Sequence, residues 1–152
     1  MMGGGQQQLQ QLSQELQALD EEIEELEAEI ADLREEQADI DDAVEAIETL
    51  DTGAAVQVPL GGGAYLRAEV QDIDEVIVSL GGNYSAEQEQ DDAIDVLRSK
   101  QESLDERIEE TEAEVDELES ESDELEQQAQ QMQQQMQQQQ MQQMQAQEED
   151  GE

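Results

Sequence analysis

Four residue types are missing from this sequence, and their absence excludes several classes of site. It contains no Cys, His, Trp or Phe, and only two Tyr. Without Cys and His, the chain cannot form a disulfide, a thiol nucleophile, a Ser-His-Asp triad or a zinc site with nitrogen or sulfur ligands. Pairs of carboxylates are common, but they fall on convex helix faces without an apolar wall to shift a pKa. We therefore expect no enzymatic activity, no cofactor and no metal.

Basic residues are also scarce. Five Lys and Arg stand against 44 Asp and Glu among 152 residues, which gives a formal net charge of −39. At this charge we expect no direct binding to nucleic-acid phosphate. The chain has no run of about 18 apolar residues that could span a bilayer, and its first residues lack the basic and apolar segments of a secretory signal. The sequence predicts a single-domain, cytoplasmic protein that does not enter a membrane.

Two separate segments carry apolar residues at alternating spacings of three and four. High charge with few aromatics is also typical of disorder, but a disordered acidic chain has no reason to keep a heptad repeat. The pattern predicts helices over about residues 9–50 and 88–145, each with one apolar stripe. The stripes consist of Leu9, Leu12, Leu16, Leu19, Ile23, Leu26, Ile30, Leu33, Ile40, Val44 and Ile47, then Ile94, Leu97, Leu104, Ile108, Val115, Leu118, Leu125, Ala129, Met132 and Met136, with polar Gln37, Gln101, Thr111 and Ser122 in the remaining slots.

Each stripe needs a cover, and the nearest is the other helix of the same chain, folded back antiparallel. One register gives every stripe position of the first helix a partner and never sets one polar slot opposite another. It places Ile47 opposite Leu97, Gln37 opposite Ile108 and Leu9 opposite Met136. This register is our prediction for the coiled coil.

Between the helices, at about residues 54–86, apolar residues alternate with polar or small ones, as in β-strands. Residues 56–60 and 64–70 flank three glycines and predict one hairpin. Residues 75–80 predict a third strand, which ends at Gly81-Gly82-Asn83. Residues 84–86 fit a fourth strand, whereas residues 85–88 also fit a capping box for the second helix. The sequence leaves both possibilities open.

Two hairpins of this size cannot bury their apolar faces alone. We therefore predict that their strands pair with other subunits. The fold class is α+β: a long antiparallel two-helix coiled coil with two central β-hairpins that form an oligomerisation hub. The predicted subunit interface consists of Val56, Val58, Leu60, Leu66, Val70, Val76, Val78 and Leu80.

The segments Val58-Pro59-Leu60-Gly61, Ala64-Tyr65-Leu66 and Val76-Ile77-Val78, with Leu80-Gly81 and Tyr84 after them, lie between the two heptad segments. In this arrangement the chain resembles the alpha subunit of archaeal prefoldin, over about residues 9–125. The resemblance implies one prefoldin-like domain over residues 1–152 and an ATP-independent cytosolic chaperone. It also implies a hexamer with prefoldin beta subunits, two alpha and four beta. Its coiled-coil tips would hold unfolded client proteins and deliver them to a group II chaperonin.

Holding unfolded chains requires apolar surface that is exposed and adaptable. End layers of a coiled coil open most easily, and Met adapts to many partners. The predicted client-binding residues at the tip are Leu9, Leu12, Met132, Met136, Met141 and Met144. Against this, Met at heptad spacing is more often plain core. The tail over about residues 127–152 is mostly Gln, a bias that can be functionally idle.

The surplus of acid predicts a protein of a high-salt cytoplasm, as in a halophilic archaeon, because only concentrated salt relieves repulsion between carboxylates on adjacent turns. The alternative is an acidic, solvated surface that is not an adaptation to high salt. Two other functions also stay open. One is a purely structural coiled-coil spacer, and the other is an acidic mimic of nucleic acid that binds a basic protein.

Overall fold

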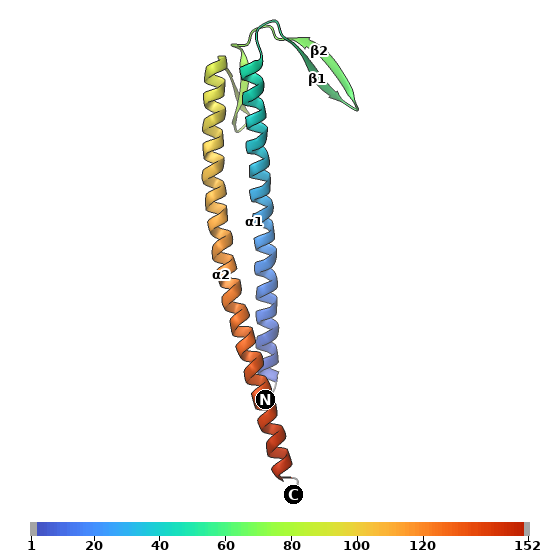
Figure 1. Ribbon diagram of the computed structural model, residues 1–152, viewed down its shortest axis with the longest axis vertical. Helices are drawn as coiled ribbons and strands as arrows, with labels where there is room; N and C mark the ends of the chain where they lie inside the picture. The colour runs from blue at the N-terminus through green and yellow to red at the C-terminus, as the bar shows by residue number, and fades with distance from the viewer. Residues whose placement is uncertain (1–2, 151–152) are drawn as a thin grey trace. The chain divides into compact units, whose positions relative to one another are not determined.

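The computed structural model describes residues 3–150. Helix α1 (Gly3–Thr49) is followed by strands β1 (Ala55–Gly61), β2 (Ala64–Glu69), β3 (Val76–Gly81) and β4 (Tyr84–Gln88), and then by helix α2 (Gln90–Asp150) (Figure 1). This confirms the predicted order of two long helices with two β-hairpins between them. In the described part of the chain, no helix is both long enough and apolar enough to span a membrane.

The contacts divide the chain into two compact units. Residues 1–30 and 110–152 form one, called here the terminal unit, and residues 31–109 form the other, called here the hairpin unit. Each unit contains a segment of α1 and a segment of α2. Within each unit the two segments run antiparallel (Figure 1).

The predicted apolar stripes lie on the inner sides of the helices. All of their residues are buried or half-buried, and Val44 is the most deeply buried large side chain, with 1 % of its surface exposed. Thr111 and Ser122 are buried in the stripe of α2. Among the described residues, no buried side-chain nitrogen or oxygen lacks a hydrogen-bond partner. The heptad pattern therefore identified the core correctly, including its polar slots.

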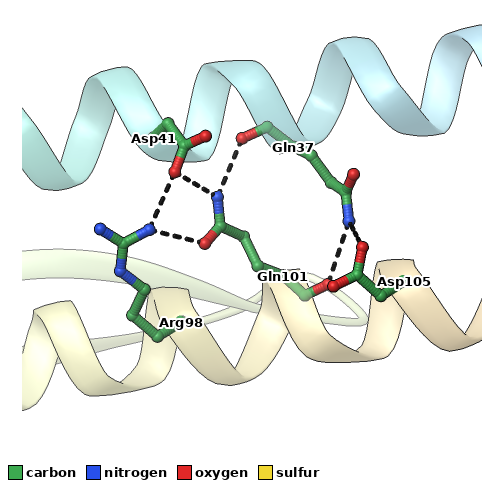
Figure 2. Close-up of polar contacts among 5 residues, drawn as sticks. All are labelled: Gln37, Asp41, Arg98, Gln101 and Asp105. Carbon is green, nitrogen blue, oxygen red and sulfur yellow. Dashed lines mark hydrogen bonds and ion pairs between the residues drawn. The ribbon is translucent and has the colours of Figure 1, made fainter.

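In the hairpin unit, however, the predicted helix register is wrong by one heptad. Gln37 faces Gln101, not Ile108: each amide Nε2 donates to the backbone oxygen of the other residue, at 3.2 and 3.1 Å (Figure 2). Where the prediction placed Leu97 opposite Ile47, Gln90 donates to the backbone oxygen of Ile47 at 2.7 Å. A glutamine amide carries two N–H donors as well as an acceptor oxygen. Facing glutamines supply partners for each other, whereas the predicted register set each against an aliphatic side chain, where its amide would lose hydrogen bonds.

This pair makes a prediction about register. Gln101→Leu should lower the free energy of unfolding by about 1 kcal/mol, because the Gln37 backbone oxygen and the Asp41 carboxylate each lose the hydrogen bond that Gln101 Nε2 donates to them. The double variant Gln37→Leu with Gln101→Leu should recover that loss or exceed wild-type stability, since a polar residue in a coiled-coil stripe specifies register at a cost in stability. Denaturant unfolding of wild type and both variants in the same molar KCl buffer measures this. A Gln101→Leu variant as stable as wild type would show that the glutamine pair does not hold the register.

Both hairpins are antiparallel, with Val58 opposite Leu66 in the first and Val78 opposite Ala86 in the second. Within residues 3–150 each forms a separate two-stranded sheet. The two central residues of each turn have positive φ, 60° and 82° at Gly62-Gly63 and 59° and 65° at Gly82-Asn83. Such turns match the twist of the flanking strands and need glycine or asparagine at both positions. The glycine-rich sequences therefore lie at the tight turns predicted for them.

The two possibilities left open near Tyr84 are resolved in favour of the strand. Because β4 extends to Gln88 and α2 begins at Gln90, the expected capping box does not form. Instead, the backbone N–H of Gln90 donates to the carboxylate of Asp74 at 3.3 Å. Asp74 lies in the link between the hairpins, where its own N–H donates to the Asp72 carboxylate at 3.0 Å. A helix N-terminus has unpaired N–H groups that an acidic side chain can cap, and here that side chain comes from another part of the chain.

Candidate functional site

The hairpins carry most of the exposed apolar surface of the chain. Of the nine large hydrophobic residues that are exposed among those described, seven lie on the hairpins: Val58, Leu60, Tyr65, Leu66, Ile77, Leu80 and Tyr84. Ile77 and Tyr84 are the most exposed of these, at 70 % and 76 %. Singly exposed hydrophobic residues are common, but a concentration of this kind marks an interaction surface.

The predicted interface residues have different environments. Val58, Leu60, Leu66 and Leu80 are exposed, whereas Val56, Val70 and Val76 are half-buried. Val78 is only 5 % exposed, so its side chain packs inside this chain. The predicted set contains residues from the first three predicted strands only and does not include the exposed Tyr65, Ile77 and Tyr84. One signal could have found the tyrosines: they are the only two aromatic residues of the chain, and both lie next to the hairpin turns.

A polar network joins α1 and α2 in the hairpin unit (Figure 2). Arg98 pairs with Asp41 at 2.8 Å, and Gln101 Nε2 donates to the same carboxylate at 2.7 Å. Gln37 Nε2 also donates to the Asp105 carboxylate. The hydrogen bonds from Gln101 and then from Arg98 lower the pKa of Asp41. The lowered pKa favours the charged carboxylate of Asp41, which accepts both hydrogen bonds. An ion pair this exposed contributes little stability by itself. The main effect of the network is therefore to align α1 with α2 in one register.

In the terminal unit, a groove of about 340 Å³ runs between α1 and α2. Glutamine amides form most of its wall, and its apolar contacts come from Leu12 and Met132. The lining consists of Gln8, Gln11, Leu12, Glu15, Gln128, Gln131, Met132 and Gln135. The groove is therefore nearly uncharged, with a single carboxylate in its lining.

The six predicted client-binding residues all lie in this unit. Leu9, Leu12, Met132 and Met136 are half-buried in the helix stripes. Met141 and Met144 are exposed, at 70 % and 71 %, on a stretch of α2 that lines a second hollow with four glutamines. The predicted partner of Met136 was Leu9. In the structure Met136 lies against Gly5, where an added Cβ would be 3.4 Å from the Met136 sulfur.

Charge is distributed unevenly along the terminal unit. Residues 4–14 and 127–147 contain no ionisable side chain, whereas residues 15–29 and 110–126 contain Asp and Glu but no Lys or Arg. Leu12, Met132, Met141 and Met144 thus lie in segments without charge, which are flanked in the sequence by acidic residues. Among the described residues, no three acidic side chains come together in a way that could hold a metal ion.

Comparisons with known proteins agree with this architecture. The family model described as "Prefoldin subunit" matches residues 19–150. The chain is 82 % identical over 112 residues to prefoldin subunit alpha of Halorubrum lacusprofundi, with 74 % of each chain covered. It is 69 % identical over 108 residues to prefoldin subunit alpha of Halobacterium salinarum, covering 71 % of this chain and 70 % of the relative.

A solved structure is also similar. The cryo-EM structure of filamentous PFD from Methanocaldococcus jannaschii matches with a TM-score of 0.51 and 30 % sequence identity, over 77 % of this chain and 93 % of that chain. The family model and the relatives confirm the resemblance drawn from the hairpin motifs and the heptads. The chain therefore belongs to the prefoldin family of chaperone subunits, and within it to the alpha subunits of halophilic archaea.

Proposed function

We propose that this chain is the alpha subunit of an ATP-independent cytoplasmic chaperone that folds as one domain over residues 1–152. Two alpha and four prefoldin beta subunits assemble through their hairpins. The terminal units hold unfolded polypeptides and deliver them to a group II chaperonin. The observation that carries the proposal is the presence of two different surfaces: an exposed apolar surface on the hairpins, and a groove in the terminal unit that is lined by Met132 and Leu12 with a single carboxylate.

The hairpins support assembly because they are incomplete alone. Isolated two-stranded sheets are marginal in water, and open strand edges readily pair with another chain. Ile77 and Tyr84 are exposed on adjacent strands. Companion subunits would cover these side chains and add strands to each sheet.

The terminal unit supports client holding because most of its exposed or half-buried Met and Leu side chains near the groove lie within residues 4–14 and 127–147, which contain no charged side chain. The lining of the groove offers Leu12 and Met132 to apolar client side chains. The surrounding glutamine amides can both donate to and accept from the client backbone. Each contact is weak, but several subunits in one assembly hold a client at high effective concentration, so that it stays bound.

The experiment mixes the purified chain with a prefoldin beta subunit in molar KCl and measures both mass and aggregation of a denatured client. We expect a hexamer that slows aggregation severalfold. Ile77→Asp should abolish the hexamer while helicity is retained, whereas Ser120→Asp, which adds the same charge on the exposed face of α2, should assemble normally. Assembly without protection would indicate a structural spacer. Salt-labile binding to a basic protein, with no effect on unfolded chains, would indicate a nucleic-acid mimic.

A further inference from the structure

A third hollow lies in the hairpin unit, where strand β3 meets helix α2. Its volume is about 230 Å³, and it is lined by Ser79, Leu80, Val96, Ser99, Lys100 and Ser103. These α2 residues lie beside the heptad stripe and not in it, so coiled-coil packing does not account for them. The lining contains one cation, three hydroxyl groups, two aliphatic side chains and no carboxylate.

Among residues 3–150, Lys100 has no acidic partner, a property that it shares with the exposed Arg67. Arg98 is paired with Asp41, and Arg34 and Arg107 also have interaction partners. Over residues 3–150, no ion pair within 4.0 Å is formed by Lys100, although the chain has 44 acidic residues. Its neighbours one helical turn away are Val96, Leu97, Ser103 and Leu104, none of them acidic. Lys100 is half-buried as a residue, and its ammonium group is available to an external anion.

The chemistry of the hollow suits a carboxylate on a short aliphatic stem. An ammonium group and serine hydroxyls can all donate to carboxylate oxygens, and hydrogen bonds to an ionised group are the stronger kind. Ser103 donates to the Ser99 backbone oxygen at 3.3 Å, a long bond that it can exchange for a carboxylate. At 1 M salt the Debye length is about 3 Å. The distant negative charge of the chain is then screened, while contact with Lys100 still attracts.

The position of the hollow indicates where the carboxylate comes from. Leu80 lines it and is 53 % exposed, on the same hairpin as the exposed Ile77 and Tyr84. Within the described chain, β3 pairs only with β4, so its other edge is open to a further strand. Because Ser79 and Leu80 of β3 line the hollow together with Lys100, a strand added along β3 would run next to the hollow. We propose that this hollow is an intersubunit site that receives an Asp or Glu side chain from a strand of a companion prefoldin subunit.

The test uses the full chain and the beta subunit of the same organism in 2 M KCl. Lys100→Gln should weaken assembly about tenfold, and Lys100→Glu should weaken it further, as measured by sedimentation. Arg107→Gln, which removes the same charge two turns along α2, should assemble like wild type. Circular dichroism of each variant checks that folding is unchanged. Changing the acidic residues on the beta subunit's strands to Lys one at a time should identify one that restores assembly with Lys100→Glu.

The proposal rests on the assembly proposed above, and the outcomes separate the two. Wild-type assembly that is unaffected by both Lys100 variants would overturn the intersubunit site and leave the proposed function intact. Failure of the wild type to assemble would overturn both. If the Lys100 variants alter only the response to exchanging chloride for another anion, without changing affinity for the beta subunit, the hollow holds a free ion and the proposal is wrong.

Discussion

A chain that ends at Gln127 is expected to assemble normally and to lose at least nine-tenths of its protection of an unfolded client. The truncation removes Gln128, Gln131, Met132 and Gln135, which are all of the groove lining that α2 contributes. It also removes Met141 and Met144, the most exposed apolar side chains of the terminal unit. The hairpins are untouched. Light scattering of a denatured client, with the hexamer first isolated by size, measures the loss.

Truncation also uncovers Leu9 and Leu12, so a second variant is needed to assign the effect. In the full-length chain, Met132, Met136, Met141 and Met144 can be changed together to Gln, a residue with similar helix propensity. This variant keeps the helix and its neutral charge but removes the apolar contacts, and it should lose most of the protection. The matched control changes four exposed glutamines on the opposite side of α2 to Ser. Full protection by both the truncated chain and the methionine variant would show that clients are held elsewhere.

Transfer from 2 M KCl to low salt is expected to remove most of the helical signal, and the terminal unit should unfold first. All five basic residues lie in residues 31–109: Arg34, Arg67, Arg98, Lys100 and Arg107. The charged side chains of the terminal unit are therefore all acidic. The Debye length grows from about 3 Å at 1 M to about 30 Å at 0.01 M. Carboxylates on adjacent helical turns, about 5–6 Å apart, therefore repel one another strongly only in dilute buffer.

Hydrogen exchange followed by residue measures this prediction. Backbone amides of residues 15–29 and 110–126 should lose protection at a higher salt concentration than those of the hairpin unit. As a control, acidification below about pH 4 protonates most carboxylates and should restore helix in dilute buffer without added salt. Full helicity in dilute buffer at neutral pH would contradict the prediction and favour an acidic surface without halophilic meaning. The relatives from halophilic archaea make the salt-dependent result the expected one.

Local patterns in the sequence were sufficient to predict the helices, the strands and the core residues. Heptad spacing placed every stripe residue on a buried face, and glycine with asparagine placed both turns. The local patterns were also sufficient to identify the family, because each hairpin motif is a short, continuous stretch of sequence. They were not sufficient for the orientation of the strands, where Val78 points into the chain while Ile77 and Tyr84 are exposed.

The sequence by itself determined where the chain is helical, where it is extended and which side of each helix is apolar. These properties depend on the backbone dihedral angles and on the rotation per residue that they produce. Residues close together in the sequence determine both. The tertiary structure alone decided the register of the helices, the cap on α2 and the isolation of Lys100. Each of these depends on residues far apart in the chain, as in the contact of Gln37 with Gln101 across 64 positions. A shift of one heptad keeps the apolar stripe of each helix facing the other helix, so the hydrogen bonds between Gln37 and Gln101 distinguish the observed alignment from its neighbour.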